Sequence, residues 1–170
     1  MRTFTFSAAV LFALLAWSRP TFAADGCPDG LVCASRPTEV ASSLAEIGYK
    51  ANLRKSDVDG DPLIDSAASG YKYTIYFYGC EKSLDCTSLQ FRVTFAQDGT
   101  NSAAMANEWN LKKRFTTMSF DPKDGTLAIG YDVTTAGGLT HANFTDVIDW
   151  WQTMLGEASK FFKEHPAPKK

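Results

Sequence analysis

The four cysteines are the residues whose spacing says most about their chemistry. Cys27, Cys33, Cys80 and Cys86 form two pairs, each six positions apart. Four cysteines allow three disulfide connectivities, and this spacing favours the local one, Cys27–Cys33 with Cys80–Cys86. A zinc site is the rival interpretation, but zinc-binding pairs usually lie about two to four residues apart. We therefore predict two short disulfide loops, no metal, no cofactor and no free thiol.

Histidine is the other residue type that could support catalysis. The chain holds two: His141 near the start of a C-terminal helical pattern, and His165 in a polar tail. A hydrolase needs a base positioned beside a nucleophile, and no nucleophile-elbow pattern accompanies His141. We therefore predict no catalytic residues. A hydrolase remains a third hypothesis, which requires His141 to lie in a cleft beside a Ser or Asp.

Alternating carboxylates at Asp57, Asp59 and Asp61 suggest a calcium loop. An EF-hand loop has Gly at its sixth position and Glu at its twelfth. Here Gly60 falls at the fourth position and Ala68 at the twelfth. The segment is more typical of a hairpin turn with clustered acids, with a weak adventitious cation site as the alternative.

The N-terminus has the pattern of a secretory signal peptide. Arg2 precedes an almost wholly apolar run, Phe6–Trp17, and small residues follow at Thr21 and Ala23. The run is shorter than the ~20 residues that span a bilayer, so we predict no membrane span. We expect residues 1–23 to be removed and the mature protein to be periplasmic or secreted in a bacterium.

Lipidation is an alternative fate for the new N-terminus. Cys27 follows Gly26, as in a lipobox, although Asp25 stands where a small apolar residue is usual. Lipidation would also leave Cys33 without its local partner.

Composition limits the class of protein. The net charge is −2, and removal of residues 1–23 takes away two arginines and no acid, which leaves −4. A nucleic-acid binder would need a basic excess, so we predict none. With 13% aromatic residues, the chain is typical of one folded domain and not of a disordered protein.

Hydrophobic periodicity predicts an α+β domain. Tyr71–Tyr78 and Leu89–Phe95 alternate apolar and polar residues, which is typical of antiparallel strands with one buried face. We expect an antiparallel sheet of about five strands, helices packed on it and a long C-terminal helix. The expected organisation is a disulfide-clamped arm (24–36), one domain (37–163) and a polar tail (164–170). The expected helices cover 37–48, 103–114 and 141–163, and the expected strands 49–53, 63–64, 71–78, 89–95, 116–120 and 126–134.

The C-terminal helix carries two apolar stripes. The first, which contains Phe144, Ile148 and Trp151, is expected to face the core. The second consists of Trp150, Met154 and Phe161, and it is the candidate partner surface because Trp and Met are favoured at interfaces. Burial of the helix on two sides is the alternative.

Several short motifs, in this order, resemble the YbjN-domain family, the bacterial sensory transduction regulators. The resemblance covers about residues 37–163 and points to an exported subgroup. It implies a fold like that of the type III secretion chaperones and a role in regulation or protein binding, and it implies no catalytic residues. The motifs are Gly48–Ala51, Asp59–Ile64, Tyr76–Cys80, Cys86–Phe91, Asn107–Asn110, Arg114–Phe115, Asp124–Gly125 and the helix Phe144–Trp151.

The leading hypothesis is therefore a non-enzymatic exported domain that binds a protein partner or itself. The alternative is a carrier of a small apolar ligand, enclosed between the Tyr- and Phe-rich sheet and the helices.

Overall fold

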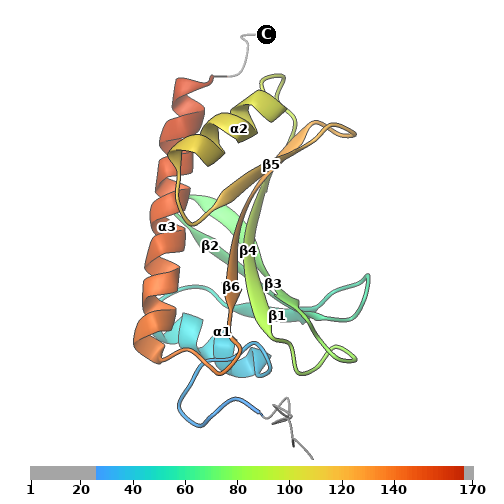
Figure 1. Cartoon of the computed structure of the whole chain (residues 1–170), viewed down its shortest axis with the longest axis vertical. Helices are drawn as coiled ribbons and strands as arrows, with labels where there is room; N and C mark the ends of the chain where they lie inside the picture. The colour runs from blue at the N-terminus through green and yellow to red at the C-terminus, as the bar shows by residue number, and fades with distance from the viewer. Residues whose placement is uncertain (1–25, 167–170) are drawn as a thin grey trace, which may run out of the picture.

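The computed structural model describes residues 26–166 (Figure 1). The predicted signal peptide lies outside the described residues, as do residues 167–170. The elements follow the predicted order, but the strands predicted at 49–53 and 63–64 lie at Asn52–Lys55 and Pro62–Ala68. They are α1 (Pro37–Glu46), β1 (Asn52–Lys55), β2 (Pro62–Ala68), β3 (Tyr71–Tyr78), β4 (Ser88–Phe95), α2 (Ala103–Lys112), β5 (Thr117–Asp121), β6 (Thr126–Thr134) and α3 (His141–Glu164).

The strands form one antiparallel sheet of six strands in the order β1-β2-β3-β4-β6-β5. All three helices lie on the same side of this sheet, and α3 runs along its whole length (Figure 1). The predicted α+β class and the long C-terminal helix are confirmed. The sheet has six strands where about five were expected, because the short β1 pairs with β2 as a separate edge strand.

Alternate side chains of the strands point to the same face of the sheet, and on one face they form an aromatic core. Ile75 lies opposite Phe91 across the β3–β4 pair, and Phe91 lies opposite Tyr131 across β4–β6, so these side chains share one face. Trp151 of α3 packs against β3 and β4. The centroid of its ring lies 5.4 Å from that of Tyr73 and 5.8 Å from that of Phe91. Its side chain is completely buried, so this helix and the sheet form one core.

Local hydrogen bonds set the ends of the helices and tie α2 to the sheet. The side chain of Thr140 accepts a bond from the backbone N–H of Asn143 and caps α3. In α2, the side chain of Asn110 donates to the carbonyl of Met118 and accepts from its backbone N–H, at 3.0 and 2.8 Å. Asn110 therefore positions α2 against β5.

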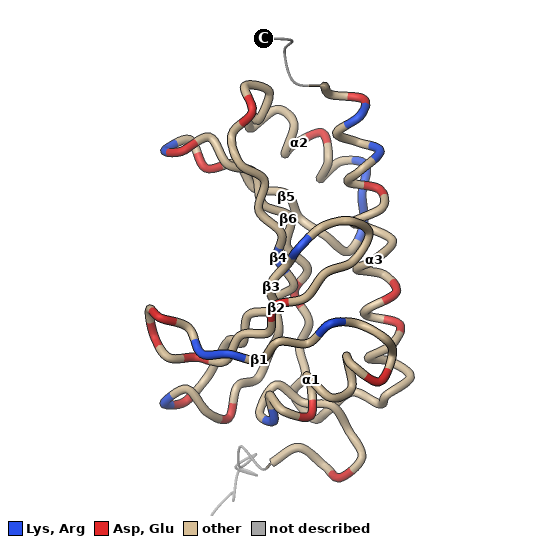
Figure 2. Tube along the Cα trace, turned by 180° about the vertical axis from the view of Figure 1, so that it is seen from behind, with Lys and Arg blue, Asp and Glu red and all other residues tan. Residues whose placement is uncertain are grey.

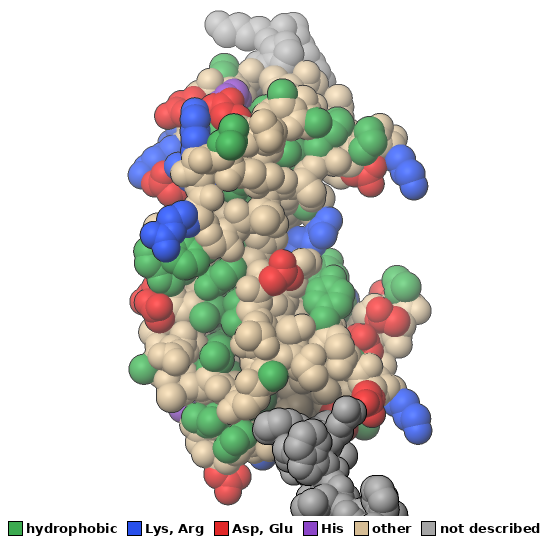
Figure 3. Space-filling model, viewed as in Figure 1, with side chains coloured by type: hydrophobic (Ala, Val, Ile, Leu, Met, Phe, Trp, Pro, Cys, Tyr) green, Lys and Arg blue, Asp and Glu red, His purple; other side chains and the backbone are tan. Residues whose placement is uncertain are grey.

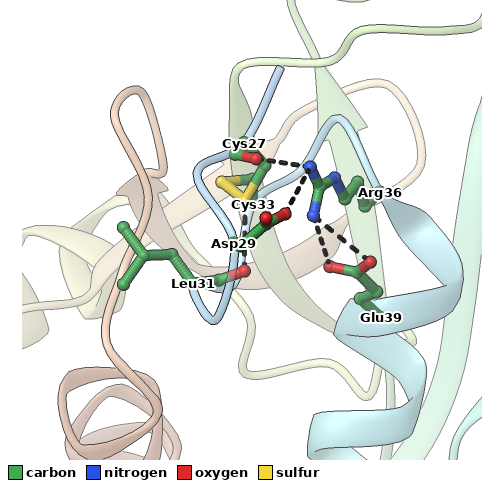
Figure 4. A network of polar contacts seen from close by, with 6 residues as sticks. All are labelled: Cys27, Asp29, Leu31, Cys33, Arg36 and Glu39. Carbon is green, nitrogen blue, oxygen red and sulfur yellow. Dashed lines mark hydrogen bonds and ion pairs between the residues drawn. A yellow bond between two sulfur atoms is a disulfide. The ribbon is translucent and has the colours of Figure 1, made fainter.

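The segment before α1 is part of the fold. Val32 and Leu139 exchange two backbone hydrogen bonds of 2.7 and 2.9 Å, which joins this segment to the loop before α3. Within it, the Cys27–Cys33 disulfide closes a short loop, and Arg36 donates to the carbonyl of Cys27 and pairs with Glu39 at 3.4 Å (Figure 4).

The face of the sheet opposite the helices is open. The β1–β2 and β5–β6 turns project from this side, and the space-filling view shows the surface indented between the projections (Figures 1 and 3). Acidic residues gather on the β1–β2 turn (Figure 2). The turn holds the exposed carboxylates of Asp57 and Asp59, and the side chain of Asp59 accepts the backbone N–H of Asp61. The predicted acid-rich hairpin turn thus accounts for this cluster.

Candidate functional site

The structure separates the three residues of the predicted partner surface. Trp150 is 37% exposed, whereas Met154 is 7% and Phe161 is 4% exposed. The ring of Phe161 packs edge-on against Trp109 of α2, with centroids 5.5 Å apart. Helix α3 is therefore buried against α2 as well as against the sheet. Met154 and Phe161 belong to the core, and only Trp150 can reach a partner.

Trp150 has a neighbour that the sequence analysis did not assign to the surface. The ring of Phe115 lies over Trp150 with centroids 4.4 Å apart and is itself 41% exposed. Phe115 stands in the loop between α2 and β5. Its other ring contact is Tyr131 of β6, at 6.4 Å and edge-on. The two exposed rings, which we call the aromatic pair, bridge this loop and α3.

The backbone at Phe115 is strained. Its φ is +66°, a left-handed conformation that costs an L-residue with a bulky side chain about 1–2 kcal/mol. Such strain persists only where surrounding contacts stabilise it, and it is concentrated at functional sites. Here the conformation aims the ring of Phe115 at Trp150.

Charged groups surround the aromatic pair. The guanidinium of Arg114 lies over the ring of Phe115, 4.9 Å from its centroid, a distance typical of a cation–π contact. On the α3 side, Asp146 is exposed. Burial raises the pKa of the Tyr131 hydroxyl, and the charge of Asp146 raises it further. The pair therefore has a cation on the loop side and the carboxylate of Asp146, four residues before Trp150, on the helix side.

The two histidines lie in different surroundings. His141 is exposed, and its ring makes no hydrogen bond within residues 26–166. It does not meet the condition that the hydrolase hypothesis set. His165 stacks on Phe161 with centroids 4.3 Å apart, and its Nε2 lies 3.1 Å from a carboxylate oxygen of Glu108. Its hydrogen bond with the Phe161 carbonyl and the partner Glu108 raise its pKa. This contact anchors the end of α3 to α2.

The cysteine sulfurs are bonded in pairs, Cys27 to Cys33 and Cys80 to Cys86. No sulfur is left for a zinc ion or for nucleophilic chemistry. Within residues 26–166, no group of three or more His, Cys, Asp or Glu side chains is arranged to hold a metal ion. In the same part of the chain, no helix combines the length and the apolar character needed to cross a bilayer.

Two hollows lie on the open face of the sheet. One, of about 420 Å³, is lined by polar side chains of β3 to β6, and the other, of about 490 Å³, by side chains of β1 to β4 and Lys50. They share Tyr76, Arg92 and Thr94. Their lining is polar and charged, and they lie on the face away from the helices, so neither is the apolar space between sheet and helices that the carrier hypothesis requires. A third hollow, of about 440 Å³, has Tyr71 and Phe95 of the sheet and Phe162 of α3 in its lining.

These features define a class: a domain with one antiparallel sheet, three helices on one face and an exposed aromatic pair beside the C-terminal helix. The comparison with known families agrees. The family model YbjN, described as "Putative bacterial sensory transduction regulator", matches residues 36–164. The chain belongs to this family, as its resemblance in sequence predicted. No curated protein matches the chain.

Proposed function

We propose that this protein is an exported, non-enzymatic regulatory module that binds a partner protein through the aromatic pair of Phe115 and Trp150. The observation that carries the proposal is the contact between these two exposed rings, in which Phe115 adopts a strained conformation. Aromatic side chains dominate the binding energy of many protein interfaces because they bury much apolar area with little loss of conformational freedom. Membership of a family of regulators supports the same role.

The charged groups beside the aromatic pair indicate which side chains a partner protein would place against it. Arg114 lies over Phe115 and has no carboxylate within 4.0 Å in the described part of the chain. A partner that places an apolar side chain on the aromatic pair and a carboxylate beside Arg114 would satisfy both. We therefore propose a protein partner whose contact residue is apolar and flanked by an acid.

Export is supported by the signal-peptide pattern of residues 1–23 and by the two disulfides, which persist mainly in oxidising compartments. The non-enzymatic role is supported by the solvent-exposed His141 and by the disulfide bonding of all four cysteines. We propose that the mature protein is periplasmic or secreted from a bacterium.

A crosslinking pull-down from an envelope extract tests the proposal, with the mature domain as bait. Trp150→Glu and Phe115→Glu test the pair, and Val58→Glu is the matched control because Val58 is 94% exposed at the β1–β2 turn. We expect a partner that is captured by the wild type and by Val58→Glu and is lost with both pair variants, and that binds the purified domain directly. Capture that is equal in all four baits contradicts the proposed surface. Sedimentation of the same four proteins tests whether the captured partner is a second copy.

A further inference from the structure

The hollow over β1 to β4 is lined by three cations without partners. Lys50, Lys72 and Arg92 all line this space of about 490 Å³ on the open face of the sheet. None of them lies within 4.0 Å of a carboxylate in residues 26–166. Asn52 and Thr74 line the same hollow and add hydrogen-bonding side chains.

The one carboxylate in this hollow is already occupied. Asp65 accepts two hydrogen bonds from the guanidinium of Arg54, at 2.6 and 3.1 Å, and one from the hydroxyl of Thr74, at 2.9 Å. The bond with Arg54 is the main reason why the pKa of Asp65 is lowered. Asp65 is therefore paired mainly with Arg54, with a smaller contribution from the charge of Lys50, and the hollow keeps an excess of positive charge.

The fold places Arg92 at the centre of the open face. Arg92 lies opposite Thr74 on β3 and opposite Gly130 on β6. Because Gly130 has no side chain, nothing on that neighbouring position covers Arg92. Arg92 is partly buried, so its charge is less screened than that of a fully exposed lysine. Tyr76, which also lines the hollow, stacks on Tyr78 with centroids 6.3 Å apart and provides a phenol hydroxyl nearby.

The adjoining hollow has the opposite character. Asp121 and Asp124 line it, and each accepts a backbone N–H of its own turn, from Lys123 at 2.8 Å and from Thr126 at 2.9 Å. These carboxylates would repel an anion at their end of the face. Arg92 lines both hollows, and a negatively charged ligand is favoured on the side of Lys50 and Lys72, away from these carboxylates.

We infer that this hollow is a binding site for a small anion with two or more negative charges, held by Arg92 with Lys50 and Lys72. Guanidinium groups bind carboxylates and phosphates through two parallel hydrogen bonds, and ammonium groups add charge without fixed geometry. A volume of this size suits a small ligand and not a single ion such as chloride. The site does not use the aromatic pair, so it stands or falls independently of the proposed function.

Calorimetric titration of the mature domain at low ionic strength tests the site, with citrate as the carboxylate probe and pyrophosphate as the phosphate probe. We expect saturable binding of at least one probe, weakened about tenfold or more by Arg92→Met. The control is Lys163→Met, which removes an exposed cation from α3, on the other side of the sheet (Figure 1), and leaves the affinity unchanged. Binding of only one probe identifies the anion class.

If Arg92→Met does not fold, a second variant and the salt dependence of binding test the site instead. The double variant Lys50→Met/Lys72→Met lies on exposed positions, and we expect it to weaken binding severalfold. Added sodium chloride is expected to weaken binding further because the interaction is ionic. Absence of saturable binding of both probes would overturn the inference. It would also be overturned if Arg92→Met, or the double variant in its place, binds as tightly as the wild type.

Discussion

The ammonium of Lys113 lies 2.8 Å from a carboxylate oxygen of Glu157, and this ion pair joins the end of α2 to the middle of α3. Lys160 approaches the other oxygen of the same carboxylate at 2.6 Å. Hydrogen bonds from Lys113 and then Lys160 lower the pKa of Glu157 to about 2. Helices α2 and α3 are therefore linked by a charge that persists in acid.

This pair predicts a specific loss of stability in acid. A lowered pKa in the folded state means that Glu157 stabilises the fold above its ordinary value of 4.5, and that this contribution is lost as the pH falls toward about 2. Between pH 7 and pH 3, we expect the free energy of unfolding to decrease more in the wild type than in Glu157→Gln. Urea unfolding at both pH values measures it. Glu164→Gln, also on α3, is the control and should behave as the wild type; an identical pH response of Glu157→Gln and wild type would contradict the prediction.

His165 predicts the opposite pH response at the end of the same helix. The hydrogen bond with the Phe161 carbonyl, together with Glu108, raises its pKa above the ordinary 6.5. Its contribution is therefore complete below pH 6.5 and is lost as the pH rises through the raised pKa. An NMR titration should give His165 a pKa above 6.5 in the wild type and a lower one in Glu108→Gln. A pKa that does not change in Glu108→Gln would show that Glu108 is not its partner.

The left-handed backbone at Phe115 predicts an unusual order of stability between two truncations. Phe115→Gly and Phe115→Ala both remove the ring from Trp150, but only glycine adopts a φ of +66° without a steric penalty. We expect Phe115→Gly to be the more stable variant by about 1 kcal/mol, measured by urea unfolding. If Phe115→Ala is equally stable or more stable, the backbone is not strained at this position.

Two adjacent glycines before α3 allow alanine substitutions with the same backbone strain but different packing to be compared. Both have positive φ, +81° at Gly137 and +86° at Gly138, so alanine is strained at either position. A Cβ at Gly137 would meet open space, whereas a Cβ at Gly138 would lie 2.7 Å from side-chain atoms of Leu31 and 3.2 Å from the sulfur of Cys33.

We therefore expect Gly138→Ala to be less stable than Gly137→Ala and to loosen the Cys27–Cys33 segment. Thermal unfolding measures the stability, and hydrogen exchange of the Val32 amide, which bonds to Leu139, reports the segment. Equal stability and equal exchange in the two variants would show that the segment before α1 does not pack on the loop as described.

The separation of Trp150 from Met154 and Phe161 shows where sequence reasoning reached its limit. Their spacing places all three on one side of a helix, and it cannot tell whether α2 covers that side. Trp109 covers Phe161, whereas Trp150, nearer the start of the helix, stacks on Phe115 of the loop before β5. The one available signal for Phe115 was an aromatic residue directly after a charged run at the end of a predicted helix. Phe115 and Trp150 lie in different elements, and the spacing of residues within one helix cannot predict that they come into contact.

Local signals along the chain were enough to predict the order and type of the helices and strands. Period-two alternation predicted Tyr71–Tyr78, and it matches β3 residue for residue. An apolar stripe of 3.6-residue period predicted α3, and the six-residue spacing of the cysteines predicted their pairing. The matching family model confirmed the family that the order of short motifs had indicated.

Which side chains these elements expose depends on how they pack together in three dimensions. The strand register brings Arg92 opposite Gly130, and the pairing of Arg54 with Asp65 leaves the neighbouring cations without partners. Packing in the core buries Met154 and Phe161 and leaves only Trp150 of the same stripe exposed, beside a Phe from a distant loop. Surface chemistry depends on which groups neutralise or cover one another across the chain, and those distances exist only once the sheet and the helices have packed.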